Sequence, residues 1–201
     1  MNGQEIEAKF YVNNLRNIEL RLRELKAQLI QPRIHETNLR FDNVNGDLRS
    51  NYRVLRLRQD QRAHLTFKGP GEEIEGVLSR REIEFMVEDF ESARQFLEAL
   101  GFRVIVFYEK FRTTYQLEDT HIMLDELPYG NFVEIEGESV DAVRPIADLL
   151  GLQWDALIKV GYQALFERIT GKYSLEPSQL SFAALEKVRI TAEDLSVQPA
   201  D

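Results

Sequence analysis

The chain has 201 residues, of which 43% are hydrophobic and 29% are charged, the proportions of a globular protein long enough to bury a core. It contains no cysteine, which excludes disulfides, thiolate chemistry and thiolate metal sites. The formal net charge of −9 argues against a general nucleic-acid binder, and the sequence has neither a signal pattern nor an apolar stretch of membrane length, so we expect a cytoplasmic protein that contacts neither nucleic acid nor membrane.

The first half of the chain predicts strands with two amphipathic helices between them. Alternating apolar residues indicate strands, and apolar residues three or four apart indicate helices. In chain order we first expect a strand over 5–12, a helix from Leu15 to about Ile30 with Pro32 marking its end, a strand through 39–42 and a turn at 43–47. A hairpin of strands 52–59 and 62–68 and a mobile loop GPGEEIEG at 69–76 are expected next. A strand over 81–87 and a helix over 90–100, ended by Gly101, complete this half.

The second half predicts further strands followed by two helices. The expected elements are strands over 104–115, 121–125 and 132–136, a helix over 140–150 with Pro145 near its first turn or at a kink, a helix over 155–170 stopped by Gly171, and a partly helical or disordered appendage. We therefore expect one domain over 1–171 and a tail over 172–201. Because the helices are too few to alternate with all the strands, the pattern favours an α+β fold, with an antiparallel sheet or barrel and helices packed outside it.

Charged residues two positions apart occur in five of the predicted strands. Such residues share one face of a strand. The segments are Glu5/Glu7/Lys9, Arg56/Arg58, Glu82/Glu84, Lys110/Arg112 and Glu134/Glu136, and the residues between them are mostly apolar. For any single strand, a half-buried sheet with its charged face in water explains the pattern best. Here, however, acids and bases are sorted by strand, and if helices cover the apolar faces, the charged faces must line the interior of a curved or closed sheet.

A charged interior is costly unless a ligand fills it, because buried unpaired charges are not tolerated and buried pairs barely break even. A polyphosphate with a bound divalent metal ion would satisfy charges of both signs. Lysine and arginine bind phosphate oxygens, and carboxylates bind hard cations such as Mg²⁺ or Mn²⁺. The tripeptide Glu-Ile-Glu occurs in three of these strands, at 5–7, 82–84 and 134–136. It is weak evidence for a site by itself, because a fourth copy at 73–75 lies in the predicted loop.

The ordered set of motifs resembles the CYTH family, also called triphosphate tunnel metalloenzymes, which includes class IV adenylate cyclases, thiamine triphosphatases and inorganic triphosphatases. One E-x-E-x-K is a weak signal, whereas a full set in the family's order is strong. The matches are E-x-E-x-K at 5–9, LRLR at 55–58, LTFKGP at 65–70, RREIE at 80–84, EKFR at 109–112, IMLDELPYGNFVEIEG at 122–137 and KVGYQALF at 159–166. The resemblance spans roughly residues 3–170 and implies a closed eight-stranded antiparallel β-barrel that forms a tunnel.

The resemblance also implies roles for the matching residues. The first choices as ligands of Mg²⁺ or Mn²⁺ are Glu5, Glu7, Glu134 and Glu136. Second choices, as ligands, anchors of the ligands or partners of the cations, are Glu82, Glu84 and Asp125. The triphosphate is expected to bind to Lys9, Arg56, Arg58, Lys68, Arg80 (or the adjacent Arg81), Lys110 and Arg112. The candidate catalytic residues are Lys159 and Tyr162. Lys159 either closes over the tunnel, positions the attacking group or is a solvated helix lysine.

Two enzymatic activities are consistent with these motifs. Metal-dependent hydrolysis of an inorganic, nucleoside or other organic triphosphate is favoured, because it needs only the tunnel. Conversion of ATP to cyclic AMP and pyrophosphate, as in class IV adenylate cyclases, also needs an adenine pocket, for which the sequence offers no motif. A third reading is a non-catalytic sensor of polyphosphate or nucleotide, although a sensor could dispense with the metal carboxylates. The resemblance also makes a homodimer plausible.

Overall fold

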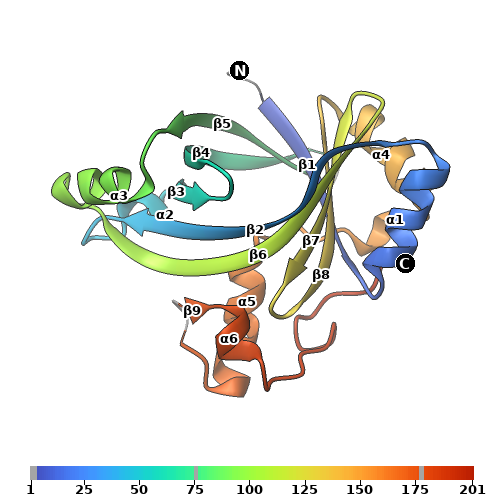
Figure 1. The fold of residues 1–201 in the computed structure, drawn as a ribbon. Helices are drawn as coiled ribbons and strands as arrows, with labels where there is room; N and C mark the ends of the chain where they lie inside the picture. The colour runs from blue at the N-terminus through green and yellow to red at the C-terminus, as the bar shows by residue number, and fades with distance from the viewer. Residues whose placement is uncertain (1–3, 75–76, 177–178) are drawn as a thin grey trace.

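The computed structural model describes residues 4–74, 77–176 and 179–201 (Figure 1). Its elements are β1 (Gln4–Val12), α1 (Leu15–Glu24), β2 (Gln28–Asp42), α2 (Asp47–Ser50), β3 (Val54–Gln59), β4 (Ala63–Ile74), β5 (Val77–Val87), α3 (Phe90–Ala99), β6 (Arg103–Leu117), β7 (Thr120–Leu127), β8 (Gly130–Gly137), α4 (Val140–Leu149, with Pro145 inside), the 3₁₀ helix η1 (Trp154–Ala156), α5 (Tyr162–Tyr173), β9 (Gln179–Leu180) and α6 (Phe182–Leu185). No helix within these described ranges is long and apolar enough to cross a membrane.

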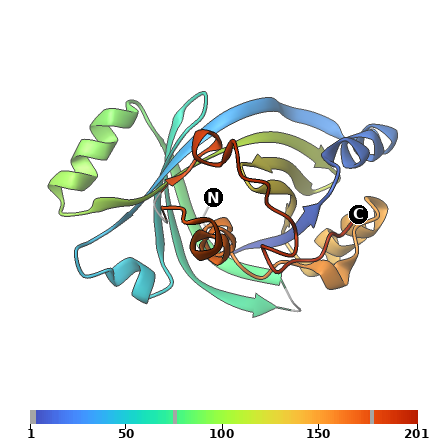
Figure 2. The same cartoon turned by 90° about the horizontal axis from the view of Figure 1, so that it is seen from below.

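Within the described residues, eight antiparallel strands are hydrogen-bonded in the order β2, β3, β4, β5, β1, β8, β7, β6. An additional pairing between β2 and β6 joins the two ends of this order, so the hydrogen bonds run around a ring. The short strand β9 adds to β6 in parallel. Seen from below, the strands curve around the centre of the molecule, and α5 and the C-terminal segment lie across the ring (Figure 2). The predicted α+β fold with an eight-stranded antiparallel sheet is confirmed.

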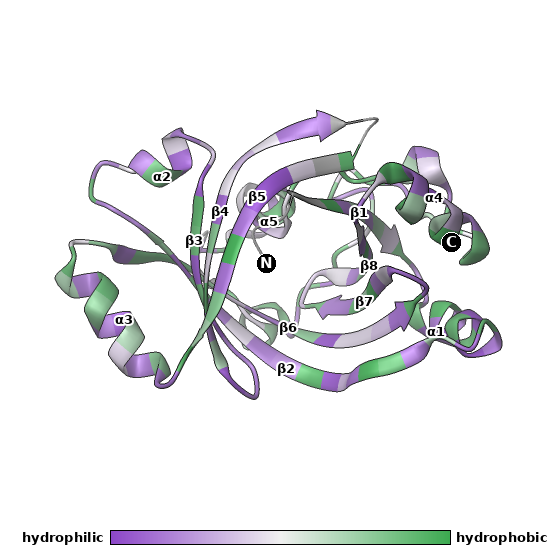
Figure 3. Ribbon diagram, turned by 90° about the horizontal axis from the view of Figure 1, so that it is seen from above, coloured by the Kyte–Doolittle hydropathy of each residue, from purple (hydrophilic) through white to green (hydrophobic). Residues whose placement is uncertain are grey.

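The helices α1 and α4 cover the outer face of the sheet near β1, β7 and β8 (Figure 1). Ile18 and Leu22 of α1 and Val143 and Ile146 of α4 are buried in the main core, together with strand residues such as Ile135. Successive side chains of a strand point to opposite faces, so the charged neighbours of these strand residues point into the ring. Hydrophilic and hydrophobic residues both occur along strands such as β2 (Figure 3).

Two further apolar clusters complete the fold. Leu97 of α3 packs against Phe41 on another part of the outer face. At the lower end of the ring, Leu165 of α5 is buried in one cluster with Phe132 of β8 (Figure 1). Phe132 is on the same face of its strand as Glu134, two residues away. The interior of the ring therefore changes from charged to apolar toward α5.

The prediction of a helix as far as Ile30 is wrong. The helix α1 ends at Glu24, Lys26 adopts a left-handed conformation with φ of 59°, and β2 begins at Gln28. Pro32 lies within β2, in an irregular stretch of its pairing with β6, where a residue without an N–H is tolerated. The regular spacing of leucines led to an overestimate of the length of the helix, because it does not reveal the single left-handed residue at which the chain turns.

The predicted mobile loop GPGEEIEG is largely strand. β4 continues to Ile74 after an irregularity between Lys68 and Gly71, while residues 75–76 lie outside the described part of the chain. β5 begins at Val77, earlier than predicted. Glycine and proline are typical loop signals, but a bulge in a sheet accommodates both. The local composition therefore indicated a loop where the structure has an irregular hairpin.

The prediction for the last long helix is also wrong at both ends. Residues 154–156 form only the 3₁₀ helix η1, and α5 starts at Tyr162 and continues past Gly171. The segment between them is bound to the sheet, since the Ile158 N–H donates a hydrogen bond of 2.8 Å to the carbonyl of Lys9. A segment held to a strand in this way cannot continue as a helix, which is a tertiary effect that local spacing does not report.

The end of the tail packs against the ring. The Ala200 N–H donates to the carbonyl of Tyr11, and the Ala200 carbonyl accepts from the N–H of Gln153, both at 2.9 Å. The carboxylate of Asp201 accepts the backbone N–H of Asn13 at 2.8 Å, just before α1. These bonds tie the C-terminal residues to β1 and to the segment after α4.

Candidate functional site

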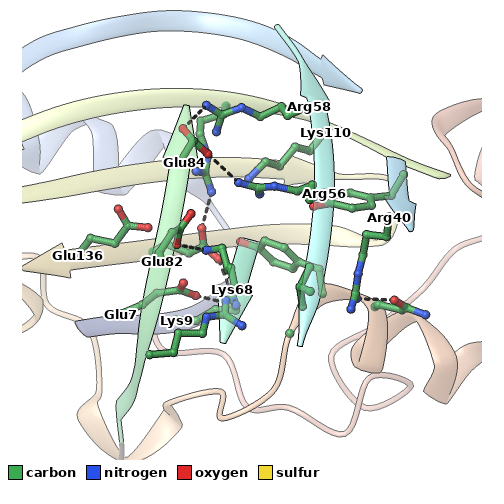
Figure 4. Close-up of a pocket in the computed structure, with 18 residues that line it drawn as sticks. Glu7, Lys9, Arg40, Arg56, Arg58, Lys68, Glu82, Glu84, Lys110 and Glu136 are labelled. Atoms are coloured by element: carbon green, nitrogen blue, oxygen red, sulfur yellow. Dashed lines mark hydrogen bonds and ion pairs between the residues drawn. The ribbon is translucent and has the colours of Figure 1, made fainter. Parts of the chain in front are cut away.

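The strands of the ring and the start of α5 surround a cavity of about 220 Å³ with a strongly charged wall (Figure 4). The described residues that line it are Glu7, Lys9, Arg40, Val54, Arg56, Arg58, Lys68, Arg80, Glu82, Glu84, Tyr108, Lys110, Arg112, Glu134, Glu136, Gly161, Tyr162 and Gln163. Eight of these described residues are lysine or arginine and five are glutamate, an excess of three positive charges in a chain whose net charge is −9. The charged strand faces thus meet around one cavity.

Three glutamates from adjacent strands form an acidic trio at this cavity. Glu7 comes from β1, and Glu134 and Glu136 come from β8, with Glu7 opposite Glu136 in the strand register. Each offers a carboxylate oxygen, and these oxygens lie within 4.8 Å of one another. Oxygen atoms alone form the donor set that hard divalent cations such as Mg²⁺ and Mn²⁺ prefer. The acidic trio therefore has the chemistry of a divalent-cation site.

Lys9 lies between two members of the acidic trio. Its ammonium nitrogen is 2.9 Å from Glu7 Oε1 and 3.1 Å from Glu134 Oε1. Burial lowers the pKa of Lys9, but the two carboxylates outweigh burial and raise it above its ordinary value. Burial likewise raises the pKa of Glu134, but the neighbouring cations, led by Lys9, hold it well below the ordinary range. Both side chains are therefore charged at neutral pH.

Asp125 of β7 lies behind the cavity wall and is fully buried. Its carboxylate accepts hydrogen bonds from Lys110 Nζ at 2.8 Å and from Arg112 Nε at 2.6 Å. The Tyr162 hydroxyl donates to the same carboxylate at 2.8 Å. Of the roles considered for Asp125, the structure has it as the partner of two cations, which it positions toward the cavity.

The wall formed by β3, β4 and β5 pairs each acid with cations. Glu84 accepts from Arg56 at 3.3 Å and from Arg58 at 3.2 Å, and Lys68 lies 2.6 Å from Glu82. Burial raises the pKa of Glu84, but Arg58 and its other neighbours outweigh burial and lower it. Glu84 therefore remains ionised and neutralises part of the positive charge of this wall.

Tyr162, the first residue of α5, forms part of the floor of the cavity. Its ring lies 5.1 Å from that of Phe132, with the Lys9 ammonium 4.4 Å from its centre. Burial and the Asp125 carboxylate raise the pKa of Tyr162 well above its ordinary value. The phenol therefore keeps its proton at neutral pH and donates a hydrogen bond to Asp125.

Besides Asp125, the candidate catalytic residue Lys159 does not line the cavity. Lys159 lies outside the cavity and pairs with Glu73 at 2.7 Å, and the side chains of both are 55% exposed. The side chain of Glu5 lies outside the described part of the chain, although its backbone pairs with Arg80. Lys159 therefore acts as a surface cation in this structure.

Four residues at or beside the cavity were not predicted from the sequence, namely Arg40, Tyr108, Gln163 and Glu36. Tyr108 was detectable, because it lies two residues before Lys110 on the same face of β6. Arg40 and Glu36 share a face of β2 in the same way, but the strand was predicted only from residue 39, so their alternation could not be seen. Nothing in the sequence marks Gln163.

Glu36 is 2% exposed, and its carboxylate lies 3.6 Å from Lys110 Nζ. Burial raises the pKa of Glu36, but Lys110, Arg112 and further cations outweigh burial and lower it to about 2 from an ordinary 4.5. The folded protein therefore binds a proton at this carboxylate less readily than the unfolded chain does. Glu36 stabilises the fold at neutral pH, and acid must remove that contribution.

We expect the contribution of Glu36 to be complete above pH 4.5 and to be lost as the pH falls toward 2. The loss is on the order of 3 kcal/mol. Urea unfolding from neutral pH down to about 2 should show a free energy of unfolding that falls less steeply with acid in Glu36→Gln than in the wild type. Equal pH dependences of the two proteins would contradict this assignment.

The fold and the site together define a class of protein, in which a ring of antiparallel strands surrounds a pocket that combines carboxylates suited to a metal ion with cations suited to a polyanion. The family model of the CYTH domain matches residues 3–149, and the chain belongs to the CYTH family. The family resemblance of the sequence motifs is confirmed.

Similar proteins carry two kinds of description. A relative from Methanocaldococcus jannaschii named putative adenylate cyclase is 27% identical over 173 residues, which cover 80% of this chain and 97% of the relative. The structure of a putative adenylate cyclase from Vibrio parahaemolyticus matches with a TM-score of 0.75 and 20% identity, over 83% of this chain and 99% of that one. A putative adenylyl cyclase from Hippeastrum, described as having a dominant triphosphatase activity, matches with a TM-score of 0.56 and 21% identity, over 96% of this chain and 100% of that one. The two structures share the fold with this chain.

Proposed function

We propose that the protein is a divalent-metal-dependent enzyme that hydrolyses a triphosphate inside the strand ring, which then acts as a closed barrel around its substrate. The observation that carries the proposal is the presence of an acidic trio and a surplus of lysine and arginine around one cavity. A polyphosphate with its metal ion needs both sets, whereas most other ligands need only one.

In this scheme Glu7, Glu134 and Glu136 hold Mg²⁺ or Mn²⁺. A bound divalent ion acts as a Lewis acid on phosphate oxygens and neutralises charge that develops during phosphoryl transfer. The lysines and arginines of the wall bind the remaining phosphate oxygens, and arginine can do so with two parallel hydrogen bonds. Asp125 positions Lys110 and Arg112, and the Tyr162 ring positions Lys9. Lys159, which pairs with Glu73 outside the cavity, takes no part.

The chemical step is an in-line displacement at the terminal phosphorus. The oxygen of a water molecule forms a bond to that phosphorus while the bond to the bridging oxygen breaks. Diphosphate and orthophosphate leave, and the water proton not retained by the products passes to solvent. The charged wall contributes mainly by holding the chain of phosphates straight and by neutralising its oxygens.

The size of the cavity favours hydrolysis over cyclisation of ATP. At about 220 Å³ it lies below the roughly 300–1,000 Å³ typical of pockets for drug-sized ligands. Among its described lining residues, Val54 is the one aliphatic side chain, and the ring of Tyr162 already packs against Phe132 and Lys9. An adenine base would have to bind outside this cavity.

A class IV adenylate cyclase is the second candidate function, because the relatives from Methanocaldococcus and Vibrio carry that name. The dominant triphosphatase activity described for the Hippeastrum protein supports the first candidate. Both reactions would use the same metal and phosphate ligands, so the reaction products must distinguish them.

Incubation with tripolyphosphate, ATP or thiamine triphosphate, each with Mg²⁺ or Mn²⁺, tests the proposal. We expect orthophosphate release that requires the metal ion and is stopped by a chelator. Cyclic AMP with pyrophosphate as the main products of ATP would establish the cyclase instead. Tight binding of triphosphate without turnover would identify a sensor and overturn both enzymatic assignments.

A further inference from the structure

Arg40 of β2 differs from most other cations of the cavity in its partner. It lines the cavity, and its guanidinium donates a hydrogen bond to the side-chain oxygen of Gln163 on α5 (Figure 4). No carboxylate of the described residues lies within 4.0 Å of it. By contrast, carboxylates contact Lys9, Arg56, Arg58, Lys68, Lys110 and Arg112. Arg40 is thus paired with a neutral amide.

The surroundings of Arg40 are positive. Arg56 is its partner in the register of β2 and β3, and the Nε of Arg56 is buried without a hydrogen-bond partner among the described residues. Burial lowers the pKa of Arg40, and so do Arg80 and Arg56, which together outweigh the opposite effects of Tyr108 and Glu167. Burial raises the pKa of the Tyr108 hydroxyl, yet nearby cations, led by Arg56, outweigh burial and lower it. Arginine stays charged at neutral pH, and the Arg40 guanidinium contacts no carboxylate of the described residues, so this part of the wall carries positive charge that a bound anion could contact.

The part of the cavity wall around Arg40 is also remote from the acidic trio. In Figure 4, Arg40 and Glu136 lie on opposite sides of the cavity, with Lys9 and Lys68 between them. A short anion bound at the trio through a metal ion would not reach Arg40, whose partner would remain the neutral amide of Gln163. A longer anion could reach both ends, and a phosphate group could replace Gln163 as the partner of Arg40.

We propose that Arg40, with Arg56, forms an anion subsite for the phosphate group farthest from the acidic trio, and that this subsite makes the cavity selective for triphosphates over diphosphates. Gln163 holds the guanidinium until that phosphate displaces it. The subsite deepens the proposed function and rests on it. Arginine suits this role because its planar fork of donors matches two phosphate oxygens.

Calorimetric titration in Mg²⁺ with two non-hydrolysable probes tests the subsite. The probes are a methylene-bridged triphosphate analogue and methylenediphosphonate, which differ by one phosphorus group. We expect Arg40→Gln to weaken binding of the three-phosphorus probe by about 10- to 100-fold, the range for one lost charge-assisted contact. Binding of the two-phosphorus probe should weaken by less than about 3-fold, because that probe does not reach Arg40.

Three variants separate this role from a structural one. Gln163→Ala removes the tether and keeps the guanidinium, so binding of the three-phosphorus probe should persist. Arg49→Gln removes a cation that contacts Glu167 on α5 at 3.1 Å outside the cavity, and it should change neither affinity. Arg40→Lys keeps the charge and loses the planar set of donors, so we expect it to weaken binding of the three-phosphorus probe less than Arg40→Gln does. Arg40→Lys also provides a measurable protein if Arg40→Gln does not fold.

Equal weakening of both probes in Arg40→Gln and Gln163→Ala would mean that Arg40 only tethers α5, and would overturn the subsite. Unchanged binding of the three-phosphorus probe in Arg40→Gln would also overturn it, while leaving the proposed function intact. A wild-type protein that binds neither probe would overturn the proposed function and the subsite together.

Discussion

Replacing Glu134 with glutamine is expected to lower metal-dependent tripolyphosphate hydrolysis by about 100-fold or more. Glu134 supplies one of three carboxylate oxygens within 4.8 Å of one another, and a neutral amide is a weaker ligand for a hard divalent ion. A 100-fold loss corresponds to about 2.7 kcal/mol of transition-state stabilisation, within the several kcal/mol that a catalytic metal supplies. Steady-state rates of tripolyphosphate hydrolysis across a Mn²⁺ titration measure this loss. The variant should also need a higher Mn²⁺ concentration than the wild type to reach half of its maximal rate.

The fold should survive this change, because Lys9 keeps Glu7 and Arg112 keeps Asp125 as partners. Glu126→Gln is the matched control, since Glu126 belongs to the neighbouring strand β7 and pairs with Arg33 at 2.6 Å away from the cavity. We expect wild-type rates from it. Equal rates and equal metal dependence in Glu134→Gln and the wild type would show that the acidic trio does not hold the metal.

Replacing Asp125 with alanine is expected to destabilise the folded protein by about 3–5 kcal/mol. The fully buried carboxylate is bound to Lys110, Arg112 and the Tyr162 hydroxyl. Removing it leaves two cations without one of their main counter-charges in a region that already has more positive than negative groups. Urea unfolding at neutral pH measures the change.

A conservative and a neighbouring variant make this prediction specific. Asp125→Asn retains an oxygen that can accept a hydrogen bond, so its destabilisation should be smaller, and it provides a measurable protein if the alanine variant does not fold. Glu126→Ala breaks an exposed ion pair next to it in sequence, and we expect it to cost less than about 1 kcal/mol. An Asp125→Ala variant as stable as Glu126→Ala would contradict a role for Asp125 in holding the cations.

Local sequence patterns correctly predicted which side chains of a strand face the core and which face the cavity. Glu134 and Glu136 flank Ile135, and the structure has the isoleucine in the outer core and the two glutamates at the cavity. This succeeds because side-chain direction in a strand alternates residue by residue, so it is a local property. The same logic applied to β6 would have added Tyr108, which is in phase with Lys110.

Patterns of the same local kind failed where the outcome depends on distant parts of the chain. Leucine spacing predicted a first helix that is too long, because the turn at Lys26 and the pairing of β2 with β6 decide where the helix ends. Gly171 was expected to stop a helix, yet α5 continues through it while packing across the ring. Packing outweighs the roughly 1 kcal/mol that an interior glycine costs a helix.

The sequence by itself determined the family, the α+β class and which residue types face the interior, since motif order and strand alternation are read along the chain. Only the tertiary structure decided which charges become partners. That Asp125 sits behind two cations, that Lys159 lies at the surface and that Arg40 meets Gln163 all depend on contacts between residues far apart in the sequence. Strand register and the docking of α5 set those contacts, and both are fixed by burial summed over the whole ring rather than by any single segment.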